Sequence, residues 1–253
     1  MDLFALDGKT AVVTGGTRGI GLMIATGLLR AGADQVVVSS RKADAGEAAV
    51  RELTPYGKAV SIPADLSQEA ECLRLAAEVA ALTDRVHVLV NNAGAAWGAP
   101  LEEFPALGWD KVVDLNLKSP FYLTRALLPL LEAAASADDP ARVINIGSID
   151  GLRTPTLPTY SYSASKAGVH QLTRVLAREL GPRNITVNAI APGPFDTKMT
   201  SSLDKDSAAE RSPLGRIGRD DDMAGAAVYL SSRAGAYVTG AVIPVDGGLY
   251  TTT

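Results

Sequence analysis

Residues 11–21 decide the fold, and they read Ala11-Val12-Val13-Thr14-Gly15-Gly16-Thr17-Arg18-Gly19-Ile20-Gly21. An apolar run typical of a strand ends at Thr14, and helical spacing begins near Gly19. The glycines allow a tight turn and a close approach of the backbone to a pyrophosphate, which the free N–H groups of the following helix would bind. The spacing G-x-x-x-G-x-G differs from the common G-x-G-x-x-G and lacks the Gly-Lys-Ser/Thr ending of a P-loop. A nucleotide-binding turn is predicted, and glycines that serve packing alone are the alternative. The residues expected to contact the nucleotide are Gly15, Thr17, Arg18, Gly19, Ile20 and Gly21.

Short runs rich in Val, Ile and Leu recur along the chain between longer segments with helical spacing. The runs are Thr10–Thr14, Val36–Ser39, Ala59–Ile62, Val86–Val90, Arg142–Ile146, Thr186–Ile190 and Ala241–Val245. The helical segments are Ile20–Ala31, Ala43–Leu53, Gln68–Ala81, Gly108–Ala135, Tyr160–Leu180 and Asp221–Leu230. Nearly continuous apolar runs suit strands that are buried on both faces of a parallel sheet. The alternation predicts one α/β domain over residues 1–253, with a doubly wound, Rossmann-like sheet of seven parallel strands and a flexible lid over about residues 194–222.

The composition limits the class of protein. The chain has 253 residues, a net charge of -4 and 47% hydrophobic residues, so it can bury a large core and is too apolar for disorder. A slightly acidic balance without a run of Lys or Arg argues against nucleic acid as a partner, and no apolar stretch is long enough to cross a membrane. Cys72 is the only cysteine and there are two histidines, which suits a reducing compartment and gives no metal-ligand cluster. The short acidic start does not suit a signal peptide, and we expect a cytoplasmic protein.

The end of the second predicted strand distinguishes NAD from NADP. A carboxylate about 20 residues after the turn would hold the ribose 2′-hydroxyl of NAD. Here the strand is followed by Ser40-Arg41-Lys42, with no acidic residue. Arg41 and Arg18 can converge on a 2′-phosphate through charge-assisted hydrogen bonds. NADP(H) is therefore predicted in preference to NAD(H), and two solvated surface arginines are the alternative.

Tyr162 and Lys166 lie four residues apart at the start of the predicted helix Tyr160–Leu180, so they share one helix face. An ammonium beside the phenol can lower its pKa from the usual value of about 10. The hydroxyl would then be a usable proton donor to a ketone oxygen. Tyr160 has Ala164 at the same offset and is the weaker candidate. Such a pair also occurs by chance on exposed helices, so it requires further support.

Three predicted strand ends supply that support, because the carboxyl ends of parallel strands meet at one edge of a sheet, where ligands bind. Gly15 follows the first strand, Asn91-Asn92-Ala93-Gly94 follows the fourth, and Ser148 follows the fifth. The alternative is a Ser148 that caps a helix and asparagine amides that satisfy local backbone. The combination of nucleotide turn, serine, tyrosine and lysine favours a catalytic site.

These motifs resemble the short-chain dehydrogenase/reductase family over essentially the whole chain. The matching pieces are Thr14–Gly21, Asn91–Gly94, Ser148, Tyr162–Lys166, Pro192-Gly193 and Pro244–Gly248. The resemblance implies hydride transfer, with Tyr162 as general acid in reduction or base in oxidation and Lys166 holding the nicotinamide ribose. It further implies that Ser148 binds the substrate oxygen and that Asn116 positions a water for proton relay.

The same resemblance implies further cofactor contacts and an oligomer. Asp65 and Leu66 would contact the adenine, Asn91 the adenosine, and Phe195 with Thr197 the nicotinamide amide. The complete set of implied cofactor contacts outside the glycine turn is Ser40, Arg41, Asp65, Leu66, Asn91, Ala93, Gly94, Tyr162, Lys166, Pro192, Gly193, Phe195 and Thr197. A homotetramer built on the helices Gly108–Ala135 and Tyr160–Leu180 is implied as well. His170, on the second of these helices, is predicted to be a satisfied interface histidine and not a catalyst.

Within the family, the chain is similar to the bacterial 3-oxoacyl (β-ketoacyl) reductases, including the branch linked to rhamnolipid synthesis. The stretches that carry this likeness are Pro63–Ser67, Ala96–Ala99, Pro140–Ser148 and Gly235–Tyr237. It implies NADPH-dependent reduction of a 3-oxoacyl thioester or a related β-keto compound. Where those enzymes carry a basic patch, Leu131–Pro140 is neutral to acidic, which weakens docking of an anionic acyl-carrier protein and leaves Arg178 as the basic candidate. A free ketone or a coenzyme A thioester remains open.

Two alternatives to this function remain. One is an alcohol, sugar or steroid dehydrogenase of the same family that works in the oxidative direction. The other is a nucleotide-sensing module without turnover, against which the complete set Asn116, Ser148, Tyr162 and Lys166 argues, because a sensor needs no proton donor.

Overall fold

The computed structural model describes residues 3–200 and 204–252. Seven parallel strands form one sheet in the order β3-β2-β1-β4-β5-β6-β7. The strands are β1 (Thr10–Thr14), β2 (Gln35–Ser40), β3 (Lys58–Pro63), β4 (Val88–Asn91), β5 (Ala141–Ile146), β6 (Ile185–Pro192) and β7 (Val242–Val245). The predicted doubly wound sheet is confirmed. The strand order reverses between β1 and β4, so the crevice beyond their carboxyl ends is the expected ligand site of this topology.

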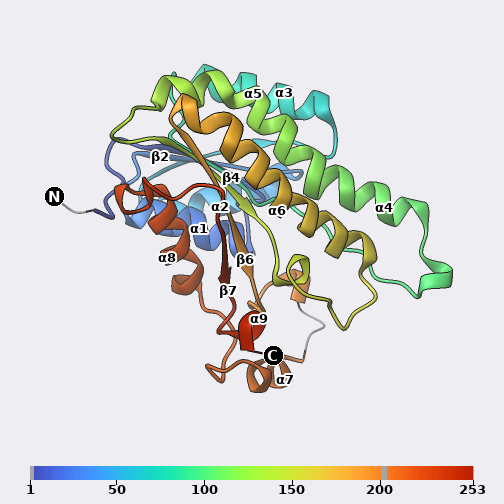
Figure 1. Ribbon diagram of the computed structural model, residues 1–253. Coiled ribbons are helices and arrows are strands. Elements are labelled where there is room, and N and C mark those ends of the chain that lie inside the picture. The colour runs from blue at the N-terminus through green and yellow to red at the C-terminus, as the bar shows by residue number, and fades with distance from the viewer. Residues whose placement is uncertain (1–2, 201–203, 253) are drawn as a thin grey trace.

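Helices cover both faces of the sheet (Figure 1). The α-helices are α1 (Gly19–Arg30), α2 (Ala43–Leu53), α3 (Glu69–Leu82), α4 (Ala106–Val113), α5 (Ser119–Ala134), α6 (Tyr160–Leu180), α7 (Lys205–Arg211), α8 (Asp220–Ser231) and α9 (Leu249–Thr252). One core lies between the sheet and α3, α5 and α6, and a second lies between the sheet and α1, α2 and α8. Val12 belongs to the first core and Val13 to the second, because successive strand side chains point to opposite faces. This burial on both sides explains the continuous apolar runs. Within the described residues, no helix is both long and apolar enough to cross a membrane.

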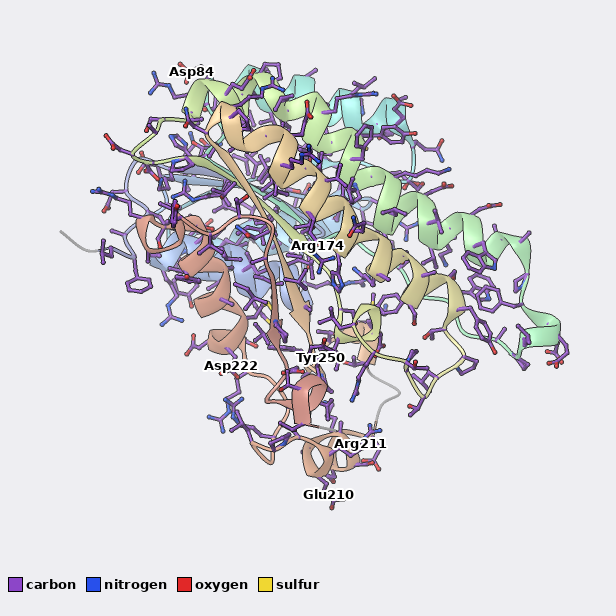
Figure 2. The ribbon with its side chains drawn as sticks, in the orientation of Figure 1. Asp84, Arg174, Glu210, Arg211, Asp222 and Tyr250 are labelled. Atoms are coloured by element: carbon purple, nitrogen blue, oxygen red, sulfur yellow. The ribbon has the colours of Figure 1, made fainter. Side chains whose placement is uncertain are left out.

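The segments that follow the last strands gather at one end of the molecule. Asp84, which precedes β4, lies at the opposite end from Tyr250 on α9 and from Glu210 and Arg211 on α7 (Figure 2). The predicted lid, residues 194–222, contains α7 and a 3-10 turn over Lys198–Thr200. Its residues 201–203 lie outside the described part of the chain, and its flexibility stays a prediction.

The structure divides one predicted helix. The segment predicted as a single helix over Gly108–Ala135 consists of α4, a π-helical turn over Asp114–Lys118, and α5. Pro120 has no N–H to donate to the carbonyl of Asn116 four residues earlier, which disfavours a regular α-helix there. Single π-turns of this kind are frequent at functional sites, and this one carries Asn116.

Candidate active site

The glycine turn after β1 is built for close backbone contact. Gly15 and Gly19 have φ values of 62° and 51°, a region that side chains other than glycine rarely adopt. A Cβ on Gly21 would lie 2.8 Å from the carbonyl carbon of Gly15 and closer still to the Gly15 oxygen and to Asn92 Nδ2. The turn is therefore packed without room for side chains, and its binding of a pyrophosphate stays a prediction.

Thr14 and Asn92 tie this turn to the loop after β4. The Thr14 Oγ1 atom accepts hydrogen bonds from the N–H groups of Asn92 (2.9 Å) and Ala93 (3.0 Å). The Asn92 side chain donates in return to the carbonyls of Thr14 (2.8 Å) and Gly15 (3.2 Å). Neither residue has a predicted role, although both lie within motifs of the sequence. The double clamp holds the two strand ends together at the point where the strand order reverses.

The predicted adenosine side lies at the aligned ends of β1, β2 and β3. Arg18 and Arg41 are exposed, and neither forms an ion pair within the described residues. Asp65 accepts hydrogen bonds from the main chain (3.2 Å) and hydroxyl (2.8 Å) of Ser67, which hold its carboxylate at the sheet edge. Leu66 is buried in the core beneath α3, so a nucleotide can reach this residue only through its main chain.

Asn91 is committed to the interior of the sheet. Its side-chain amide donates to Asn145 Oδ1 (2.9 Å) and to Thr124 Oγ1 (3.3 Å), and Asn145 donates onward to Thr173 on α6 (2.9 Å). The predicted contact of Asn91 with adenosine is therefore left to its main chain. Gly94, by contrast, lies at the centre of the site: a Cβ there would be 3.3 Å from Asn116 Oδ1 and 3.8 Å from Lys166 Nζ.

Ser148, Tyr162 and Lys166 come together at the carboxyl end of β5, as predicted. Ser148 follows β5 and hydrogen-bonds with Tyr162, and its Oγ also accepts from the N–H of Asp150 (3.1 Å). The ammonium of Lys166 lies 5.6 Å from the centroid of the Tyr162 ring and donates to the carbonyl of Ile146 (2.7 Å). The buried helix face of α6 thus presents a phenol to the serine hydroxyl with a cation beneath the ring.

The pKa of Tyr162 moves in the direction opposite to the one predicted. Burial raises the pKa of Tyr162 to about 12, the charge of Asp150 adds to this, and the hydrogen bond with Ser148 opposes it. Burial also lowers the pKa of Lys166 to about 8. The predicted lowering of the tyrosine pKa by Lys166 is wrong for this structure, because burial dominates and the ammonium is directed to the Ile146 carbonyl. Tyr162 consequently holds its proton at neutral pH.

Asn116 acts within this structure as a clamp. It is 2% exposed, its Oδ1 accepts from the N–H of Ala95 (2.8 Å), and its Nδ2 donates to the Ala95 carbonyl (2.9 Å) and to Ser165 Oγ (3.0 Å). The side chain therefore joins the loop after β4 to α6, one turn from Tyr162. These bonds occupy the amide, and the positioning of a water by Asn116 stays a prediction.

The segment after β6 closes the other side of the site. A Cβ on Gly19 would lie 3.2 Å from Thr197 Cγ2, so Thr197 stands against the glycine turn, and its contact with the nicotinamide amide stays a prediction. The Phe195 ring is 2% exposed and packs on Gly218, which leaves the main chain of Phe195 for any contact with a cofactor. Pro192 ends β6, and Gly193 packs against Asp246 after β7.

His170 is not the interface histidine that the sequence analysis predicts. Its side chain is 2% exposed within this chain, where it fills the space beneath the turn that carries Ser148. Side chains at Gly147 and Gly151 would collide with the imidazole. Burial lowers the pKa of His170 to about 4, and nearby Lys166 adds to the effect, so the ring is neutral at physiological pH.

The comparisons with known proteins agree with this geometry. The family model described as Enoyl-(Acyl carrier protein) reductase matches residues 15–250. The chain is 50% identical over 254 residues to the rhamnolipids biosynthesis 3-oxoacyl-[acyl-carrier-protein] reductase of Pseudomonas aeruginosa, with 98% of each chain covered. It resembles the solved Pseudomonas aeruginosa RhlG/NADP active-site complex with a TM-score of 0.96 at 48% identity, covering 99% of each chain.

A more distant solved relative is a gluconate 5-dehydrogenase from Burkholderia cenocepacia J2315 in complex with NADP and tartrate. Its TM-score is 0.91 at 32% identity, covering 100% of this chain and 99% of that chain. The family model and both solved relatives span nearly the whole sequence, including the glycine turn and the Ser148, Tyr162 and Lys166 positions. This chain therefore belongs to the short-chain dehydrogenase/reductase family of oxidoreductases.

Proposed function

We propose that the protein is an NADPH-dependent carbonyl reductase that acts on a 3-oxoacyl thioester or a related β-keto compound, with Tyr162 as the general acid. The observation that carries the proposal is the convergence of Ser148, Tyr162 and Lys166 beside the glycine turn. The name of the relative that is 50% identical supports the substrate class. The substrate itself stays open within that class.

The residues at the turn fit a dinucleotide phosphate. Side chains at Gly15 or Gly21 would collide with neighbouring backbone and with Asn92, so the turn keeps its glycines, and Arg18 and Arg41 stand exposed at the strand ends where a 2′-phosphate would need cations. Both solved relatives described above bind NADP. When bound, NADPH supplies the hydride that reduces the carbonyl carbon.

The protein's part in the reaction is to hold the carbonyl and to deliver a proton. The Ser148 hydroxyl donates a hydrogen bond to the substrate oxygen, and Tyr162 transfers its phenolic proton to that oxygen as the carbon is reduced. The raised pKa of about 12 keeps the proton on Tyr162 until it is needed. The Lys166 ammonium, 5.6 Å from the ring centroid, would hold the nicotinamide ribose, and a proton from solvent restores the phenol.

An acyl-carrier protein is not part of the proposal. The acidic Asp139 in the segment Leu131–Pro140 lies within ion-pair distance of Lys9 and Arg142, and Arg183 is paired with Glu132. Arg178 on α6 is exposed and is the remaining basic candidate. A coenzyme A thioester or a free β-keto compound needs no such basic patch.

We further propose a homotetramer that assembles through α5 and α6, in the cytoplasm. Phe121 on α5 is 40% exposed and Val175 on α6 is 55% exposed, which leaves apolar surface on both helices. The single cysteine, Cys72, is buried and suits a reducing compartment. Light scattering of wild type and of a Val175→Glu variant tests the assembly, and a wild type that is monomeric would contradict it.

The decisive experiment compares NADPH oxidation on acetoacetyl-coenzyme A by the wild type, Tyr162→Phe and the control Tyr160→Phe. Tyr160 meets Phe104 edge to face with ring centroids 5.3 Å apart and donates no proton in the proposed chemistry, so its variant should retain the turnover that Tyr162→Phe loses. Tyr162→Phe should lower kcat by about 100-fold or more, the usual effect of losing a general acid, with unchanged affinity for NADPH. Unchanged turnover in Tyr162→Phe would reject the mechanism. Equal rates with NADH would reject the cofactor preference.

A further inference from the structure

Asp150 occupies a position that the proposed mechanism does not use. It lies two residues after Ser148, and its N–H donates to the serine hydroxyl oxygen at 3.1 Å. This hydrogen bond opens a 3-10 turn over Ile149–Gly151 and fixes the main chain of Asp150 to the reacting serine. The carboxylate is half-buried and has no hydrogen-bond partner or ion pair within the described residues. The position of this negative charge is thus set by the residue that binds the substrate oxygen.

The surroundings of Asp150 are mostly uncharged. It lies on the wall of a cavity of about 540 Å³ between residues 150–159 and the first two turns of α6. Arg153 is the other charged residue on this wall, and its Nη1 donates to the carbonyl of Leu249 on α9 (3.2 Å). The guanidinium is therefore directed toward the C-terminal helix.

The electrostatics of the site link Asp150 to the reacting groups. Among the charged residues near Tyr162, Asp150 is the one that adds to the raised pKa of the phenol. Burial also raises the pKa of Asp150 itself, and Arg153 opposes this effect. Lys166 donates to Ile146, and His170 beneath the turn is neutral. A ligand oxygen held by Ser148 would therefore lie beside the main chain of Asp150, whose carboxylate forms no ion pair within the described residues and feels the charge of Arg153.

We propose that Asp150 selects substrates according to their charge. The site excludes carbonyl compounds that carry a carboxylate near the ketone and accepts thioesters or esters of the same β-keto acids. This inference rests on the proposed carbonyl reductase function and narrows it. An anionic group beside the ketone would be held close to the Asp150 carboxylate in a partly desolvated space, where like charges repel strongly. A neutral ester of the same size would meet no such repulsion.

The test uses ethyl acetoacetate and acetoacetate, which present the same ketone with and without a neighbouring negative charge. The wild type with NADPH should show a kcat/KM at least about 100-fold higher for the ester. Asp150→Asn, which keeps the shape of the side chain, should raise the kcat/KM for acetoacetate at least about 10-fold and change that for the ester by less than about 3-fold. Asp84→Asn removes the same charge at the end of the molecule opposite Tyr250 on α9 (Figure 2) and should change neither value.

Two results would overturn the inference. One is an Asp150→Asn variant with the wild-type ratio between ester and acid. The other is a wild type that prefers acetoacetate and loses this preference in Arg153→Gln, because a cation in the same cavity would then be binding the carboxylate.

A binding measurement separates this inference from the proposed function. Calorimetry on the NADPH complex of Tyr162→Phe measures affinity for the acid and the ester without turnover. Adding Asp150→Asn to that variant should lower the Kd for acetoacetate at least about 10-fold and leave the Kd for the ester unchanged. Absence of turnover in the wild type together with this shift would reject the carbonyl reductase and keep the charge selection, whereas no shift would reject the charge selection.

Discussion

Replacing Gly21 by alanine tests whether the turn after β1 has room for a side chain. A Cβ at this position would lie 2.8 Å from the Gly15 carbonyl carbon, where ordinary contact begins at 3.4 Å. The obstacles cannot rotate away, because one is backbone and the other is the Asn92 amide that donates to the carbonyls of Thr14 and Gly15. The turn or the β4 loop must therefore shift by roughly half an ångström or more, which is the amount by which the new Cβ would overlap its neighbours.

The magnitude follows from three contributions. Overpacking of this kind costs about 1–3 kcal/mol, and a lost Asn92 hydrogen bond costs about 1 kcal/mol. The better helix propensity of alanine returns about 1 kcal/mol. Gly21→Ala should therefore lose about 1–3 kcal/mol of stability, which lowers Tm by about 2–12 °C in a domain of this size. The affinity for NADPH should fall at least about 10-fold, because the displaced backbone is the proposed phosphate site.

Gly225→Ala is the matched control. Gly225 lies inside α8, and a Cβ there would meet no atom within 4 Å. The same substitution should therefore stabilise the protein by about 0.5–1 kcal/mol, with unchanged NADPH affinity. Thermal unfolding and fluorescence titration with NADPH measure both quantities. A Gly21→Ala protein as stable as Gly225→Ala, with wild-type affinity, would refute the account of the turn.

Two further predictions concern the cofactor and the pH dependence of stability. Arg18→Ala and Arg41→Ala should each weaken NADPH binding about 10-fold, the usual scale for one charge-assisted phosphate contact, and should leave NADH binding unchanged. Titration with both cofactors decides this, and equal losses for the two would contradict the 2′-phosphate role. Burial lowers the pKa of His170 to about 4 from its usual 6.5. Between pH 4 and pH 6.5, His170 is therefore protonated in the unfolded chain and neutral in the folded chain. The stability from a neutral His170 is therefore complete above pH 6.5 and should fall by about 2–3 kcal/mol as the pH drops to 4. His170→Gln should flatten this part of the profile in denaturant unfolding, and an unchanged slope would contradict the assignment.

The fold was predictable because its strands obey one simple constraint. Val12 and Val13 are both fully buried, and so are Val37 and Val38, since helices cover both faces of the sheet. A continuous apolar run is the direct result. The interruption between α4 and α5 was not predictable from apolar spacing, since a π-turn adds one residue without changing the composition of either helix face.

For the site residues, the ends of the predicted strands indicate position but not the direction of the side chain. A strand end places a residue at the rim of the sheet but does not say which face its side chain occupies. Leu89 belongs to the core beneath α3, α5 and α6, so Asn91, two residues later, points to the same face and reaches Thr124 on α5. Alternation along β4 contains this information once the face of Leu89 is known. Only the packing of the helices supplies that face.

The pKa of Tyr162 could not be predicted from the local sequence pattern alone. The spacing of four residues places Lys166 on the helix face of Tyr162, and this juxtaposition is present at 5.6 Å between the ammonium and the ring centroid. The direction of the pKa shift depends on burial and on the carbonyl of Ile146, which is twenty residues away in sequence. A phenol whose pKa is raised stays protonated at neutral pH, so its proton is present for transfer and the phenolate that could act as a base is scarce. Reduction of a carbonyl uses the protonated form of Tyr162, so we predict that oxidation of an alcohol by this protein requires alkaline pH, where the phenolate becomes accessible.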